Sequence, residues 1–120
     1  MVLVVDTSAL LSVVFDEPGA DVFKRLLEKE SCLISAASYV ELGTVLVRRM
    51  GASAKDDAAD LAEAFRLRVL PLDRGQAEMA IVAMAAFGKG RARPPAVLNY
   101  GDLFSYALAE IAGPAAALQG

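Results

Sequence analysis

The chain has 120 residues, with 12 Lys or Arg against 15 Asp or Glu, so its formal net charge is −3. This length indicates one domain, and the acidic balance argues weakly against a protein that binds nucleic acid through bulk charge. The sequence contains no His and one Cys, Cys32. Ser-His-Asp triads, His general bases, His-containing zinc sites and internal disulfides are therefore excluded. Catalysis by this chain has to use Asp and Glu together with a hard metal ion.

The apolar content, 56% of the residues, is high for a soluble chain. Long charge-free stretches such as Ser31–Val40 and Ile111–Gly120 nevertheless reach only about half of a membrane span. The amino-terminal residues lack the basic segment of a signal peptide. We therefore expect a cytoplasmic protein without a membrane anchor, with surplus apolar surface for a partner.

The first element in the chain is a strand over Val2–Val5, because a short, β-branched apolar run is typical of a buried strand in a parallel sheet. Asp6, Thr7 and Ser8 follow directly. Asp6 is thus expected at the carboxyl end of the strand, where open α/β sheets carry their chemistry. No Lys or Arg is close in sequence to neutralise Asp6, so its carboxylate either caps the next helix or holds a metal.

Further along the chain, strands alternate with helices, which predicts an α/β fold. We expect a single domain over residues 1–120, with a central parallel sheet of about four strands and helices on both faces. Cys32 is expected to be buried and inert, and the helix before residue 88 is apolar nearly all round, so it is buried or at an interface. The predicted elements before residue 68 are, in order, a helix over Ala9–Phe15, a helix opened by Glu17-Pro18-Gly19 with Pro18 at its first position, a strand over Cys32–Ser35, a helix from there to Met50 that stops at Gly51, and a helix capped by Ser53 with Asp56 and Asp57 in its first turn. They are followed by a strand over Val69–Leu72, a helix over Gln76–Phe87, a loop over Gly88–Leu98, a helix over Gly101–Ala112 and a last strand over Ala115–Leu118.

Three acids, Asp6, Glu41 and Asp102, lie at or just inside expected helix starts. Capping explains each acid by itself, since Ser38-x-x-Glu41 matches a capping box and Asn99-x-x-Asp102 is a looser version. In a parallel sheet, however, the strand-to-helix junctions share one edge, so the same geometry gathers the acids. Carboxylates about 5 Å apart at an effective dielectric near 20 repel by roughly 3 kcal/mol per pair. A divalent cation relieves this repulsion, and all-oxygen ligation favours Mg²⁺ or Mn²⁺.

Four segments of the sequence form a pattern in order and spacing: Val-Val-Asp6-Thr7-Ser8-Ala-Leu-Leu, Ile34-Ser35-Ala-Ala-Ser38-x-x-Glu41, Phe87-Gly88-Lys89-Gly90-Arg91 and Leu98-Asn99-Tyr100-Gly101-Asp102-x-Phe104-x-Tyr106-Ala107. Taken together, these segments resemble the PIN-domain toxins of the VapC type, and the resemblance covers essentially the whole chain. It implies a Mg²⁺-dependent endoribonuclease of a type II toxin–antitoxin pair, which acts on RNA, forms a homodimer and is inhibited by a VapB-like antitoxin.

The resemblance also assigns roles to the acids. It implies that Asp6, Glu41 and Asp102 are the acidic active-site residues. We expect Asp6 and Asp102 to hold the metal directly, and Glu41 to hold it through water or to orient that water. The hydroxyl groups of Thr7 and Ser8 are expected to position the metal or the scissile phosphate.

Three positive charges, Lys89, Arg91 and Arg93, stand in five residues shortly before the last acid. A loop exposed to solvent and a functional role explain this basic run equally well. As a functional segment, they would attract the RNA phosphate toward an otherwise repulsive acidic pocket.

The sequence departs from the family in one respect. VapC-type proteins usually have a fourth acid after the last strand, and this sequence ends at Leu118-Gln119-Gly120. Glu110 lies about 12 Å along a helix from Asp102 and cannot take its place. The chain therefore resembles a truncated PIN domain, and we expect it to hold one metal and to cleave RNA slowly or not at all.

Two other classes of function remain open at this stage. A PIN-like fold that binds RNA or a partner without catalysis would retain RNA and show no metal-dependent cleavage. A receiver or phosphatase that uses Asp6 as a phosphate acceptor is disfavoured, because position 8 is Ser instead of the second Asp of a haloacid-type phosphatase. The sequence does not indicate whether tRNA, rRNA or mRNA is the substrate.

Overall fold

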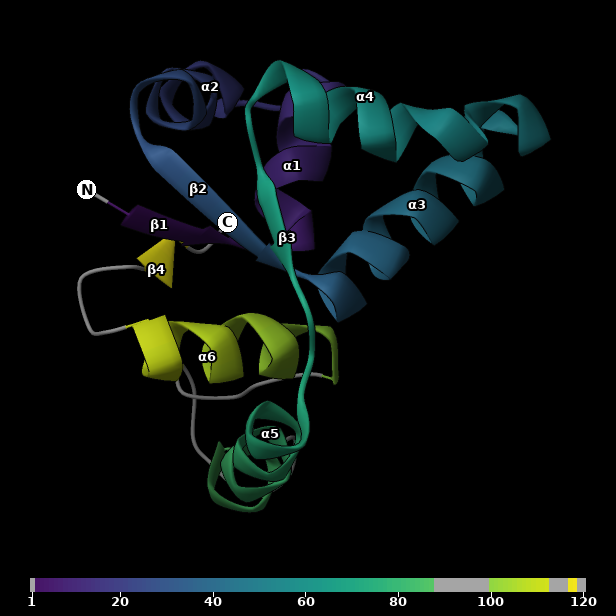
Figure 1. Ribbon diagram of the computed structural model, residues 1–120. Coiled ribbons are helices and arrows are strands. Elements are labelled where there is room, and N and C mark those ends of the chain that lie inside the picture. The colour runs from purple at the N-terminus through teal and green to yellow at the C-terminus, as the bar shows by residue number, and fades with distance from the viewer. Residues whose placement is uncertain (1, 88–99, 113–116, 119–120) are drawn as a thin grey trace.

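The computed structural model describes residues 2–87, 100–112 and 117–118 (Figure 1). Within these ranges, no helix has the length and apolar character needed to cross a membrane. The elements are, in chain order, β1 (Val2–Val5), α1 (Thr7–Val14), α2 (Ala20–Lys29), β2 (Ser31–Ser35), α3 (Ala36–Met50), the 3-10 helix η1 (Ala52–Asp56), α4 (Asp57–Ala64), β3 (Arg68–Leu70), α5 (Arg74–Phe87), α6 (Tyr100–Ala112) and β4 (Ala117–Leu118).

The sheet has the order β3-β2-β1-β4, and each neighbouring pair of strands is parallel. In the register, Leu3 of β1 lies opposite Cys32 of β2, while Val4 lies opposite Ala117 of β4. Helices α1 to α4 lie on one side of this sheet and α6 lies on the other (Figure 1). The predicted parallel α/β sheet with helices on both faces is confirmed.

The two faces of the sheet build two cores from alternate residues of the same strands. Leu3, Val5 and Ile34 pack into the larger core beneath α1 to α4. Val4 and Leu33 point the opposite way and pack with Leu108 of α6. Because both faces are covered, β1 and β2 are apolar at successive positions instead of alternating with polar residues.

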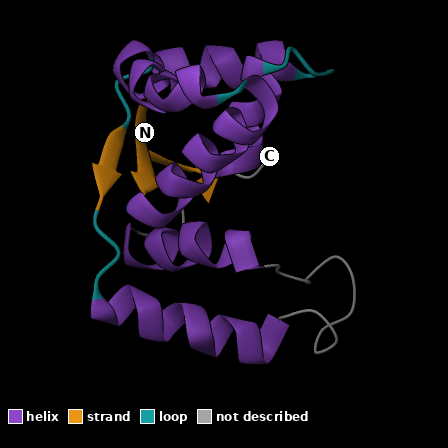
Figure 2. Ribbon diagram, turned by 90° about the vertical axis from the view of Figure 1, so that its right-hand side faces the viewer, coloured by secondary structure: helices purple, strands orange, loops and turns teal. Residues whose placement is uncertain are grey.

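Helix α5 forms the outermost layer, beyond α6 and away from the sheet (Figure 2). The contact between the two helices is made by small residues, with Ala80 and Ala83 of α5 packed against Ala107 of α6. The outward side of α5 leaves Ile81 and Val82 70% and 67% exposed. The helix predicted to be apolar all round is thus buried on one face and uncovered on the other.

The predicted helix ends are correct where a cap is strong. Helix α3 stops at Met50, and Gly51 follows with a φ of 94°, a left-handed conformation that favours glycine. Pro18 was wrongly predicted to be a first helical residue, because α2 starts at Ala20 behind the left-handed Gly19. Ser53 was wrongly predicted to be a cap, because it lies inside η1.

The acidic first turn predicted after Ser53 also needs correction. Helix α4 begins only at Asp57, and its first turn contains Asp57 and Asp60. Asp56 precedes the helix without a capping hydrogen bond from its side chain. Acids therefore lie near the positive end of the helix dipole, as expected, but they are Asp57 and Asp60 instead of Asp56 and Asp57.

Cys32 is buried, and its Sγ lies 3.4 Å from the carbonyl oxygen of Glu30. Burial, and then the charge of Glu30, raise the pKa of the Cys32 thiol. A thiol with a raised pKa carries little thiolate at neutral pH. This agrees with the predicted role of Cys32 as inert packing.

Candidate active site

Asp6 follows directly after β1 and is the N-cap of α1. Its Oδ1 accepts hydrogen bonds from the backbone N–H of Ala9 at 2.9 Å and from the hydroxyl of Ser8 at 3.0 Å. The residue is only 9% exposed. The capping role considered from the sequence is confirmed, and the two donors also fix the orientation of a carboxylate at the carboxyl end of a central strand.

The two hydroxyl residues after Asp6 have different surroundings. Thr7 is buried, and its Oγ1 donates a 3.0 Å hydrogen bond to the carbonyl oxygen of Ser38 in α3. Ser8 is exposed beside the Asp6 carboxylate, to which it donates. Ser8 therefore lies on the surface at Asp6, whereas Thr7 ties the start of α1 to the start of α3.

Glu41 is half-buried and lies well inside α3. The N-cap of that helix is Ser35, whose Oγ accepts from the N–H of Ala37 at 3.3 Å. The predicted capping box between Ser38 and Glu41 is therefore wrong, because Ser38 is already the third helical residue. Glu41 has no part in capping α3, so its position needs another explanation.

Asp102 is the third residue of α6, and its side chain lies outside the described part of the structure. Asn99, its expected capping partner, lies outside the described residues too. Ser105, one turn further along α6, is buried, and its Oγ lies 3.4 Å from the Oγ of Ser38. This contact brings the turn that follows Asp102 against the turn that precedes Glu41.

The topology explains why these turns meet. Because β1 and β2 are parallel neighbours, Asp6 and the start of α3 leave the sheet at the same edge. Helix α6 packs against β1, β2 and α3. Thr7, Ser38 and Ser105 join the first turns of α1 and α3 to the second turn of α6, and these are the helices at which the three predicted acids lie.

The expected carboxylate cluster is not tested by the described side chains. Among those, no three His, Cys, Asp or Glu side chains lie close enough together to hold a metal ion. Asp102, the third member of the predicted set, is not among the side chains described. The basic segment of Lys89, Arg91 and Arg93 also lies outside the described residues.

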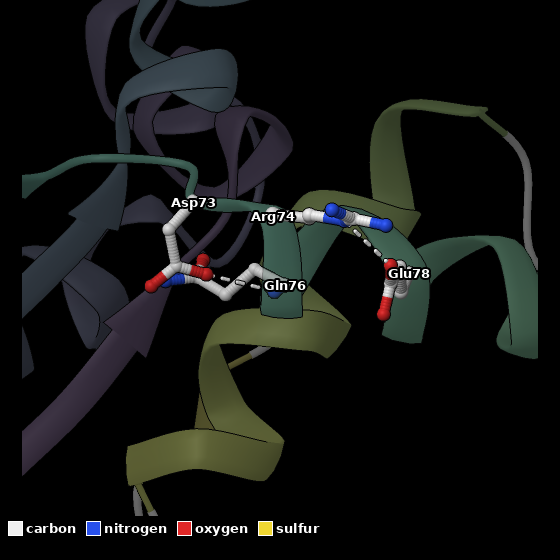
Figure 3. Close-up of polar contacts among 4 residues, drawn as sticks. All are labelled: Asp73, Arg74, Gln76 and Glu78. Atoms are coloured by element: carbon white, nitrogen blue, oxygen red, sulfur yellow. Dashed lines mark hydrogen bonds and ion pairs between the residues drawn. The ribbon is translucent and has the colours of Figure 1, made fainter.

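Another acid follows a strand end, which the sequence reasoning missed. Asp73 comes after β3 and accepts the N–H of Gln76 at 2.9 Å through Oδ1, so it caps α5 (Figure 3). On the exposed side of the same turn, Arg74 pairs with Glu78 at 2.9 Å. Asp73 has the same capping geometry as Asp6, but it stands at the edge strand. The spacing Asp73-x-x-Gln76 is the signal that would have found this cap.

Comparison with known proteins identifies the protein family to which the chain belongs. A model of the PIN-domain family matches residues 3–117. Among solved structures, the crystal structure of VapC20 of Mycobacterium tuberculosis, described as a toxin that cleaves the sarcin-ricin loop, has a TM-score of 0.73 at 22% identity and covers 96% of this chain and 86% of its own. That similarity shows that the fold is the same.

Curated relatives narrow the class. Ribonuclease VapC42 of Mycobacterium tuberculosis (strain ATCC 25618 / H37Rv) is 38% identical over 112 residues, which are 92% of this chain and 85% of the relative. Ribonuclease VapC of Mycolicibacterium smegmatis is 37% identical over the same shares. The chain therefore belongs to the VapC ribonucleases of the PIN-domain family, and it is an endoribonuclease toxin. The resemblance stated from the sequence is confirmed.

Proposed function

We propose that Asp6, Glu41 and Asp102 form one acidic site that holds Mg²⁺ or Mn²⁺ and hydrolyses RNA phosphodiester bonds. The observation that carries this proposal is that the first turns of α1 and α3 and the second turn of α6 meet at Ser38, through its contacts with Thr7 and Ser105. Capping accounts for Asp6 but not for Glu41. Support also comes from the family, because PIN-domain ribonucleases generally depend on a divalent metal.

The chemistry of the available donors fits a hard cation. The proposed ligands are carboxylate oxygens, the sequence has no His, and its single thiol is buried in the core. Such a donor set suits Mg²⁺ or Mn²⁺ and does not suit zinc. Bound there, the ion supplies Lewis acidity to a water molecule and to the phosphate oxygens. Asp6 and Asp102 hold it directly, and Glu41 holds it through water or orients that water.

Substrate contacts are assigned to residues around these acids. Ser8 is exposed next to Asp6 and is better placed than the buried Thr7 to meet a phosphate oxygen. Lys89, Arg91 and Arg93 draw the RNA backbone toward the acidic site by their positive charge. The protein acts in the cytoplasm, where its RNA substrate is found.

Incubation of the purified chain with total RNA tests the proposal. We expect cleavage in Mg²⁺ or Mn²⁺, loss of cleavage in EDTA, and recovery when excess metal is added back. The matched variant is Glu41→Gln, which keeps the size of the side chain and removes its charge, and it should abolish cleavage in every metal. Retention of RNA without cleavage in any metal would instead favour the non-catalytic RNA-binding module.

We further propose a homodimer formed through the outward face of α5. Ile81, Val82, Ala85 and Ala86 form an exposed apolar stripe one helical turn apart. Contiguous apolar surface of this kind marks interaction sites. Two copies of the chain carry the same stripe, so a two-fold axis between them would let each copy cover the stripe of the other.

Sedimentation of Ile81→Glu tests the dimer. We expect the wild-type chain to sediment as a dimer at micromolar concentration and the variant to sediment as a monomer, because a carboxylate would be buried without a partner. The control is Val22→Glu, because Val22 is 54% exposed and belongs to α2. Helix α2 lies at the opposite end of the molecule from α5 (Figure 1). A wild-type monomer, or an unchanged dimer in Ile81→Glu, would contradict this interface.

We also propose that a VapB-like antitoxin docks in a pocket of about 560 Å³ between α1, α2, α3 and α4. Its floor is apolar and its rim is acidic, so the pocket fits a segment that presents apolar side chains together with Arg or Lys. The floor includes Val13, Val14, Leu61 and Phe65, and the rim includes Asp16, Asp21, Asp57 and Asp60, with Lys24 among them.

A further inference from the structure

Three hydroxyl residues form a buried polar seam between three helices. Thr7, Ser38 and Ser105 are 5%, 1% and 6% exposed. The Thr7 hydroxyl donates to the Ser38 carbonyl oxygen, and the Ser38 hydroxyl faces that of Ser105. A buried hydroxyl without a hydrogen-bonding partner is costly, and each of these hydroxyls has a polar atom of a neighbouring helix within 3.4 Å.

The seam has a fixed relation to the acids. Ser38 stands three residues before Glu41 on α3, and Ser105 stands three residues after Asp102 on α6. Residues three apart share one face of a helix. The Ser38–Ser105 contact therefore lies about one helical turn along the chain from the position of each acid. Thr7, which directly follows Asp6 in the sequence, joins α1 to the same seam.

The distance indicates what the contact does. The two Oγ atoms are 3.4 Å apart, whereas hydroxyl–hydroxyl hydrogen bonds are usually about 2.7 to 2.8 Å. So long a bond contributes little energy. Serine is also among the smallest side chains, and interiors are packed densely enough that one added methyl group forces atoms apart. The size of the two side chains, more than their hydrogen bond, sets the separation of α3 and α6.

We propose that Ser38 and Ser105 are positioning residues that hold α3 and α6 at the separation at which Glu41 and Asp102 bind one divalent cation. This inference rests on the proposed function. Neither serine contacts the metal or the RNA; each acts through the helix on which it lies. Groups that orient metal ligands from outside typically change metal affinity about 10- to 100-fold when they are replaced.

Three substitutions of Ser105 separate spacing from hydrogen bonding. Ser105→Ala removes the hydroxyl without adding bulk, and Ser105→Thr keeps the hydroxyl and adds a methyl group. Ser105→Val removes the hydroxyl and also adds bulk. The readouts are the Mn²⁺ dissociation constant by calorimetry, the unfolding midpoint, and RNA cleavage. We expect Ala to keep Mn²⁺ affinity close to that of the wild type, and Thr and Val to weaken it about tenfold or more.

The matched control is Ser12→Val on α1. Ser12 is also a buried serine, but its hydroxyl bonds to Ala9 within its own helix, away from the seam. The Ser12→Val variant should have a lower unfolding midpoint because of overpacking, and its Mn²⁺ affinity should be unchanged. Ser105→Thr gives the milder change should Ser105→Val fail to fold.

The outcomes are distinct. Wild-type Mn²⁺ affinity in Ser105→Thr would refute the positioning role while leaving the proposed function intact. An equal loss in Ser105→Ala and Ser105→Thr would show that the hydroxyl, and not the spacing, matters, and would also overturn the inference. A wild-type chain that neither binds Mn²⁺ nor cleaves RNA would remove the proposed function and this inference together.

Discussion

Replacing Asp6 by Asn is expected to abolish RNA cleavage while the unfolding midpoint stays close to that of the wild type. Asn caps a helix about as well as Asp, so the N–H of Ala9 keeps an acceptor. What Asn lacks is the negative charge that a divalent cation requires. Asp6→Ala should lose cleavage and in addition about 1 kcal/mol of stability, because the cap is lost too. Cleavage assays and thermal unfolding of both variants measure the two effects separately.

Asp73 provides the matched control for this experiment. Its Oδ1 accepts a 2.9 Å hydrogen bond from the N–H of Gln76, the third residue of α5, as the Oδ1 of Asp6 accepts one from the third residue of α1 (Figure 3). Asp73→Asn should leave stability and cleavage near their wild-type values, and Asp73→Ala should cost about 1 kcal/mol with cleavage retained. Full activity in Asp6→Asn would show that Asp6 is a cap and nothing more.

Val14→Lys is expected to weaken binding of the VapB-like antitoxin by about 30-fold or more and to leave RNA cleavage unchanged. Val14 lines the floor of the pocket between α1 and α4. An apolar anchor at the centre of an interface is typically worth about 2 kcal/mol or more, and a lysine would bring positive charge against a basic segment. Titration of the antitoxin, with cleavage as a parallel readout, measures the change.

Val22→Lys is the control for the pocket. Val22 is exposed on α2 and does not line the pocket, so this variant adds the same charge at a different surface. It should bind the antitoxin as the wild type does. Equal affinities for Val14→Lys and Val22→Lys would remove this pocket as the docking site.

Much of the fold was accessible from local patterns. The apolar runs over Val2–Val5 and Cys32–Ser35 predicted buried strands, and both are core strands of a parallel sheet. Gly51 marked the end of α3 because glycine tolerates the left-handed conformation. The predictions at Pro18 and Ser53 are wrong because several residues in a row are able to cap a helix and only packing selects one. The third strand is also displaced, since β3 covers Arg68–Leu70 and not Val69–Leu72.

The sequence by itself determined the kind of chemistry, since a chain with no His and a single Cys can bind a metal mainly through oxygen ligands, of which the carboxylates carry the charge. It also placed Asp6 at the end of a central strand, because strand ends are encoded by residues close together in sequence. The tertiary structure alone decided that Glu41 is no cap and that Ser38 meets Ser105, 67 residues away. Such contacts depend on how helices pack across a sheet, and hydrophobic periodicity fixes which face of a helix is buried but not which residue of another helix it meets.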